Sequence, residues 1–252
     1  MKLKLNWIPN ALSLGNLTFG FISILVASSL TNDTQENSKL FLLSGIFIFL
    51  AAVFDGFDGM AARALNATSD LGAELDTLAD LTTFGIAPGF LVYKMILEKY
   101  KLDILSTGNL FPIGMLIAAI FPICAAYRLA RFTVDHDPGS FTGLPSPIAG
   151  VIIALFPISF PQNNIADFFT ISGFVLIALL MVSTIRYSKP QVAIRGKYSK
   201  EKLMIALAGF LVAMVIALLL VPHLFPYIIY GMFILYVFSG IVSILIQIIQ
   251  EF

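Results

Sequence analysis

Apolar residues fill this chain in long runs that short polar links separate. A run of about 20 apolar residues is long enough for a helix to cross the hydrocarbon layer of a membrane. We therefore expect an all-α integral membrane protein with about eight transmembrane helices. The expected helices cover residues 10–30, 39–62, 71–97, 110–132, 146–160, 166–185, 203–221 and 227–249.

The composition agrees with a membrane protein. Of the 252 residues, 58% are hydrophobic and 12% are charged, whereas ordinary soluble domains carry about 25% charged residues. The formal net charge is zero, so bulk charge gives no indication of nucleic-acid binding. The first apolar run is too long for the core of a signal peptide, and we expect it to remain as the first helix.

Basic residues are distributed unevenly between the expected loops. With the N-terminus placed inside, 11 of the 15 Lys and Arg residues fall on the inner side, and Lys39, Lys94, Lys99 and Lys101 fall outside. The cytoplasmic loops of membrane proteins carry the excess of Lys and Arg. We therefore expect both termini in the cytoplasm, together with the link between the second and third helices.

Four aspartates flank that link, beside long apolar runs. Asp55 and Asp58 are spaced i,i+3 in the second expected helix, and Asp76 and Asp80 are spaced i,i+4 in the third. Each pair shares one helix face, and the short link lets the two faces meet. Carboxylate oxygens suit Mg²⁺, Mn²⁺ or Ca²⁺. We expect the four acids to hold two divalent cations, beside Arg63, which suits a phosphate.

Two other interpretations of acids in such a chain stay open at this point. Acids at helix ends also act as caps or reach the membrane surface, as we expect for Asp33 and Asp70. Acids inside membrane helices also line ion or proton pathways. A pathway is expected to place acids near mid-membrane on several helices, whereas the four aspartates lie at one end of two helices.

The spacing of eight residues resembles, without a mismatch, the signature of the CDP-alcohol phosphotransferase family. The pattern is Asp55-x2-Asp58-Gly59-x2-Ala62-Arg63-x8-Gly72-x3-Asp76-x3-Asp80. Further segments resemble the integral-membrane phosphatidylserine synthase group of that family, over roughly residues 7–190. These segments are IPNALSLGNLTFGF (8–21), TTFGIAPGF (82–90), AYRLARF (126–132), FTGLPSP (141–147) and MVSTIRYSKP (181–190).

The resemblance implies a transfer reaction. The hydroxyl of L-serine would attack the phosphatidyl phosphorus of CDP-diacylglycerol and release CMP, with two Mg²⁺ or Mn²⁺ ions as cofactors. By the family pattern Asp55 and Asp76 would bind both ions, and Asp58 would complete one site. Asp80 would complete the other and act as the general base. The residues implied in binding the CDP-lipid are Asn10, Gly59, Ala62, Arg63, Ser69 and Gly72.

The acceptor side of the reaction is less narrowly defined. Arg128 and Arg131 share a helix face, and we expect one or both to bind the serine carboxylate, the alternative being contact with lipid headgroups. Glycerol 3-phosphate, inositol phosphate or an ether-lipid donor are alternatives that the acidic motif does not separate. A phosphorylated acceptor would be expected to need more cationic residues.

The resemblance also divides the chain. We expect a catalytic core over residues 1–190 and an extension over residues 191–252, which holds a basic loop and two further helices. By analogy with related enzymes the protein is expected to form a homodimer. The basic stretch of residues 186–202 is expected to face anionic lipid at the cytoplasmic surface.

Overall fold

The computed structural model describes residues 7–29, 34–103, 110–134, 140–160, 167–188 and 225–251. The expected helix at 203–221, Asp33 and most of the basic stretch 186–202 lie outside these ranges. The helices are α1 (Trp7–Ser28), α2 (Thr34–Ala64), α3 (Asp70–Asp80), α4 (Ala87–Met95), α5 (Ile113–Val134), α6 (Ser146–Ser159), α7 (Asp167–Val182) and α10 (Phe225–Glu251).

Smaller elements connect these helices. A π-helical segment, η1 (Leu81–Ile86), joins α3 to α4, and a 3₁₀ turn, η2 (Leu97–Lys99), follows α4. Two short antiparallel ladders lie in loops. They pair β1 (Leu102–Asp103) with β2 (Leu110–Phe111), and β3 (Ser140–Thr142) with β4 (Arg186–Ser188).

Within the described ranges, four helical stretches are long and apolar enough to cross a membrane, and shorter apolar helices accompany them. The expected all-α integral membrane protein is thereby confirmed, and each expected helix inside the described ranges has a counterpart. The four long stretches are Trp7–Ser28, Gln35–Ala64, Asp70–Met95 and Ile113–Val134.

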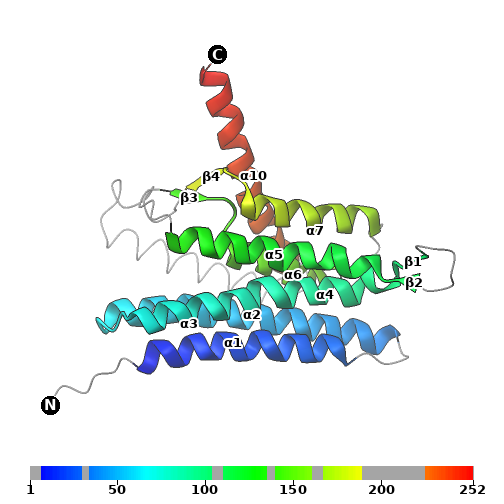
Figure 1. Ribbon diagram of the computed structural model, residues 1–252, viewed down its shortest axis with the longest axis horizontal. Helices are drawn as coiled ribbons and strands as arrows, with labels where there is room; N and C mark the ends of the chain where they lie inside the picture. Colours follow the sequence, from blue (N-terminus) through cyan, green and yellow to red (C-terminus); the bar gives the residue numbers. More distant parts are fainter. Residues whose placement is uncertain are drawn as a thin grey trace.

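Most helices run side by side as one bundle, with α1 and α2 along one side and α7 along the other (Figure 1). The short α6 forms much of the core: ten of its 14 residues are buried. Since it is apolar all round, a helix of this kind belongs inside a bundle. Phe84, Ile152 and Phe174 are among the largest fully buried side chains.

The third expected helix contains a change of helix type that the sequence pattern does not predict. Immediately after Asp80 the chain widens into the π-helical segment η1, and then continues as α4. Segments of this kind are rare and often lie at functional sites. Here the buried Thr83 of η1 packs against Gly20 of α1, where an added Cβ would lie 2.9 Å from Cα of Thr83. A residue without a side chain therefore lets α1 approach η1 closely.

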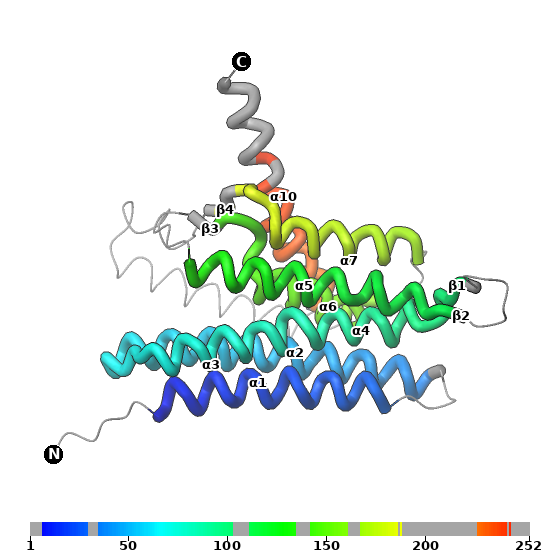
Figure 2. The backbone as a smooth tube through the Cα atoms, in the orientation of Figure 1, coloured from blue at the N-terminus to red at the C-terminus, as the bar shows by residue number. Residues whose placement is uncertain are grey.

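The last helix does not follow the bundle. Figure 1 and Figure 2 show α10 at a steep angle to the other helices. The ring of Tyr236 in α10 stacks on Tyr187 of β4, with 5.5 Å between centroids. An added Cβ at Gly240 would overlap the Tyr187 ring. The expected span 227–249 is thus a helix, and packing on β4 contributes to its direction.

Candidate active site

The link between α2 and α3 sets the positions of the acidic residues. Asn66 takes a left-handed conformation (φ 49°), which Asn tolerates better than most residues. The N–H of Ala67 donates to the carbonyl of Ala62 at 2.9 Å, a pattern that closes a helix end. Ser69 then caps α3, because its Oγ accepts a hydrogen bond from the N–H of Gly72 at 3.1 Å. Local chemistry therefore ends one helix and begins the next.

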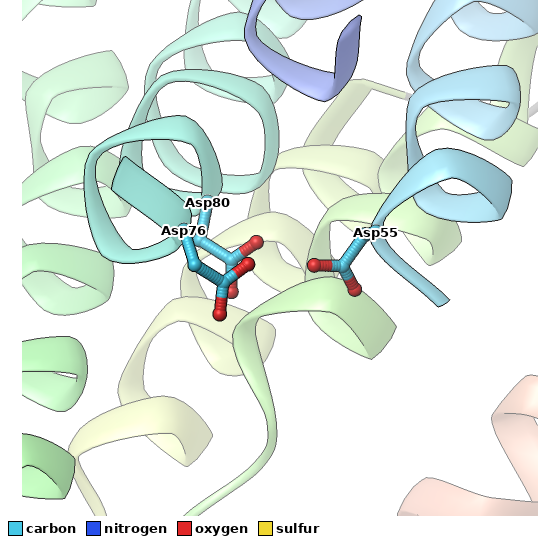
Figure 3. A group of neighbouring side chains, drawn as sticks. All are labelled: Asp55, Asp76 and Asp80. Atoms are coloured by element: carbon cyan, nitrogen blue, oxygen red, sulfur yellow. The ribbon is translucent and has the colours of Figure 1, made fainter. Parts of the chain in front are cut away.

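Three aspartates meet across the two helices. Oxygens of Asp55, Asp76 and Asp80 all lie within 4.8 Å of one another. Figure 3 shows the carboxylate of Asp55 pointing across from α2 toward the pair on α3. Asp80 is buried, and Oδ1 of Asp76 is buried without a hydrogen-bond partner among the described residues. Like charges this close disfavour one another unless a proton or a cation offsets them, and an all-oxygen set fits a hard divalent cation. The residues present therefore fit a metal site.

The fourth expected ligand, Asp58, stands beside this group and is not one of the three. Its side chain is buried, and its Oδ2 accepts a hydrogen bond from Oγ of Ser13 at 2.7 Å. It faces the pocket described next, which Asp76 also lines.

A pocket of about 160 Å³ opens between α1, α2 and the start of α3, and we call it the α1–α3 pocket. Five of the six residues expected to bind the CDP-lipid line it, and Asn10 places a buried, unpartnered Oδ1 there among the described residues. The five are Asn10, Gly59, Ala62, Ser69 and Gly72. Arg63, the sixth, is exposed, and its Nη1 would lie 3.6 Å from a Cβ added to Gly59.

A second pocket, of about 480 Å³, lies on the other side of α3, and we call it the α3–α5 pocket. Asp76 and Asp80 form its acidic wall, and Arg128 is the one cationic residue among the described residues that line it. The Arg128 side chain is buried, donates to Oγ of Ser146 at 2.9 Å, and lies over the ring of Phe132. Asp76 lines both pockets.

Comparison with known proteins identifies the family. The model of the CDP-alcohol phosphatidyltransferase family matches residues 6–185. The chain belongs to this family. It is 37% identical over 184 residues to the CDP-diacylglycerol–serine O-phosphatidyltransferase of Bacillus subtilis, which covers 73% of this chain and 90% of that protein.

Other relatives agree with this assignment. The protein of the same name from Helicobacter pylori is 35% identical over 187 residues, 71% of this chain and 70% of the relative. The archaetidylserine synthase of Methanothermobacter thermautotrophicus is 31% identical over 185 residues, 72% of this chain and 70% of the relative. The resemblance found in the sequence is confirmed at the level of the family.

The structure separates Arg128 and Arg131, one or both of which were expected to bind the serine carboxylate. In this CDP-alcohol phosphatidyltransferase, Arg131 does not line the α3–α5 pocket. Its guanidinium donates hydrogen bonds to four backbone carbonyls where α7 and β3 end, and the carbonyls at a helix end lack intrahelical partners. The acceptors are Thr142 (2.8 Å), Val182 (3.2 Å), Ser183 (3.2 Å) and Met181 (3.3 Å).

Sequence reasoning missed two polar residues of α1 that contact the acids. Ser13 bonds Asp58, and Asn16 donates from Nδ2 to Oδ1 of Asp80 at 3.4 Å. A signal for them was present, since the buried face of this apolar helix carries polar or small residues at helical spacing. These residues are Pro9, Ser13, Asn16, Gly20, Ser23 and Ala27.

Proposed function

We propose that this chain transfers the phosphatidyl group of CDP-diacylglycerol to the hydroxyl of L-serine, which gives phosphatidylserine and CMP. The family match and the names of the relatives support this reaction. The observation that carries the proposal is the position of Asp76, which lines both pockets. A donor in one pocket and an acceptor in the other would meet at the same acidic group.

The donor nucleotide is assigned to the α1–α3 pocket. Its lining offers a short polar residue, Ser69, an amide, Asn10, and small residues that leave room for a bulky group. The exposed guanidinium of Arg63 lies beside Gly59, at the edge of this pocket, and suits a phosphate oxygen. The acyl chains of the donor would extend into the surrounding lipid.

The acceptor is assigned to the α3–α5 pocket. Arg128 would bind the carboxylate of serine, and Glu74 or Asp70 on the same pocket wall would face its ammonium group. Serine is a zwitterion with one carboxylate, and the described lining residues include a single cation that could pair with it. Glycerol 3-phosphate or inositol phosphate would bring a doubly charged phosphate beside three carboxylates, which favours serine over these acceptors.

Asp55, Asp58, Asp76 and Asp80 would hold two Mg²⁺ or Mn²⁺ ions. By the family pattern Asp55 and Asp76 would serve both ions, Asp58 one and Asp80 the other. When bound, such ions stabilise the charge on the attacking and leaving oxygens of a phosphoryl transfer. Asp80 lines the α3–α5 pocket and Asp58 lines the α1–α3 pocket. This supports Asp80 as the base that takes the proton of the serine hydroxyl, which is a weak nucleophile at neutral pH.

The site is assigned to the cytoplasmic side of the membrane. The distribution of Lys and Arg supports this orientation, and both water-soluble partners, serine and CMP, would then exchange with the cytoplasm.

The test is a CMP-release assay on purified protein with CDP-diacylglycerol. L-Serine should support release, whereas glycerol 3-phosphate and inositol phosphate should not. EDTA should abolish release, and Mg²⁺ or Mn²⁺ should restore it. If CMP release were faster with glycerol 3-phosphate than with L-serine, glycerol 3-phosphate would be assigned as the acceptor instead. Full activity in excess chelator, with no tightly retained metal by elemental analysis, would contradict the metal assignment.

A further inference from the structure

Two polar side chains of α1 each contact one acid from a different helix. Oγ of Ser13 donates to Asp58 of α2 at 2.7 Å, and Nδ2 of Asn16 donates to Asp80 of α3 at 3.4 Å. Ser13 and Asn16 are spaced i,i+3, so one face of α1 serves both acids. Both side chains are buried, which shields these hydrogen bonds from competing water.

The packing of α1 against η1 determines which residues of α1 lie beside the acids. Oγ1 of Thr83 donates to the backbone carbonyl of Asn16 at 3.1 Å. Gly20, one turn further along α1, lets the backbone of η1 come close. Because η1 begins directly after Asp80, the same contact that places α1 against η1 also places Asn16 beside Asp80.

Stability alone does not account for an Asn at this position. Its Oδ1 is buried without a hydrogen-bond partner among the residues described, and burying an unpartnered oxygen disfavours folding. Leu has a similar size and would be buried in a membrane helix without that cost. The one side-chain hydrogen bond that Asn16 makes within the described chain is the one to Asp80.

We propose that Ser13 and Asn16 are positioning residues that orient the carboxylates of Asp58 and Asp80. The proposal rests on the proposed function, which gives these two acids their roles. Ser13 would act on the side of the donor, since Asp58 lines the α1–α3 pocket. Asn16 would act on the side of the acceptor, since Asp80 lines the α3–α5 pocket. Such outer partners of metal ligands typically change metal affinity or activity about 10- to 100-fold.

The experiment compares four variants of the full chain: Ser13→Ala, Ser13→Thr, Asn16→Leu and Ser23→Ala. Ser23→Ala is the matched control, because Ser23 is a buried serine on the same face of α1. It contacts Oγ of Ser44 at 2.7 Å, away from the acids. The readouts are Mn²⁺ affinity without substrates, by electron paramagnetic resonance, the melting temperature, and kcat and KM for CMP release.

Ser13→Ala should weaken Mn²⁺ binding about 10-fold or more, and Ser13→Thr, which keeps the hydroxyl, should recover most of it. Asn16→Leu should keep the melting temperature and lower kcat about 10- to 100-fold, with a smaller change in KM for the donor. Ser23→Ala should leave Mn²⁺ affinity and kcat unchanged, even where its melting temperature falls.

Wild-type affinity for Mn²⁺ in Ser13→Ala together with wild-type kcat in Asn16→Leu would overturn the inference. An equal loss of Mn²⁺ affinity in Ser23→Ala would do so too, since the effect would then be one of general packing. If Ser13→Ala does not fold, the inference is tested by kcat of Asn16→Leu alone, and a wild-type value would overturn it. Mn²⁺ affinity is measured without donor or acceptor, so a failure of serine to support CMP release would overturn the proposed function separately.

Discussion

Asp80 is buried, accepts a hydrogen bond from Asn16 of α1 and has an oxygen within 4.8 Å of one of Asp55. Its substitution should therefore affect the acidic group directly. Asp80→Asn keeps the size of the side chain and one ligand oxygen but removes the basic oxygen. We expect it to retain much of the CDP-diacylglycerol binding and to lose turnover by roughly 10²–10⁴-fold, as general bases do. Isothermal titration of the donor, paired with CMP release, measures both quantities.

Variants of Asp55 and Asp76 provide the comparison for Asp80→Asn. Their Asn variants should lose metal and donor binding together, because both residues are assigned to both ions. Near-normal turnover in Asp80→Asn would place the base elsewhere. Loss of donor binding in that variant would leave Asp80 as a metal ligand alone.

Substitutions of the two arginines of α5, Arg128 and Arg131, should have different effects. Arg128→Ala removes the cation of the α3–α5 pocket, and KM for serine should rise about 10- to 100-fold, the equivalent of a hydrogen bond to a charged group. KM for the donor should change less. Arg128→Lys keeps the charge without the planar group, and its KM for serine should lie between those of the wild type and Arg128→Ala.

Arg131→Ala should instead lower the free energy of unfolding, by about 1.5–3 kcal/mol, because four backbone carbonyls lose their shared donor. Thermal unfolding in detergent measures this, and KM for serine serves as the control. A selective rise of KM for serine in Arg131→Ala, with normal thermal stability, would assign serine binding to Arg131 as well.

At the scale of elements, the close approach of α1 to η1 is the contact most sensitive to added volume. Gly20→Ala would place a Cβ 2.9 Å from Cα of Thr83, and backbone cannot yield as a flexible side chain can. We expect a lower melting temperature and a loss of CMP release, since α1 would move away from Asp80.

Gly173→Ala is the matched control for that substitution. It adds the same methyl group to a glycine inside α7, where nothing lies within 4 Å. Higher helix propensity should stabilise it by up to about 1 kcal/mol. If Gly20→Ala and Gly173→Ala behaved alike, the packing of α1 on η1 would not limit the site.

The positions of the helices could be predicted from the sequence, whereas the contacts between them could be predicted only in part. Run length and apolar content predict α1 and α2 because crossing a membrane requires both. The facing of Asp55 toward Asp76 follows from i,i+3 and i,i+4 spacing with a short link. Periodicity carries no signal for the π-helical η1, since a segment of six residues is too short to define a period. It also cannot distinguish Arg128 from Arg131, whose partners come from residues far along the chain.

At the scale of the whole molecule, the distribution of Lys and Arg predicts which end of the bundle faces the cytoplasm. In a Cys124→Ala background, a cysteine replacing Lys197 should resist an impermeant thiol reagent in intact cells. A cysteine replacing Asn163 should react. Labelling after membrane permeabilisation checks that both thiols are accessible, and the reverse pattern would place the acidic site outside the cell.

The shared wall at Asp76 has a thermodynamic consequence. A ligand in either pocket can reposition a carboxylate that borders both, so we expect occupancy of one pocket to change the free energy of filling the other. Linkage requires this coupling to be reciprocal. An amino acid without a hydroxyl, such as L-alanine, should therefore change the Kd of the donor by some factor without turnover. The donor should change the Kd of L-alanine by that same factor, and unequal factors would contradict the coupling.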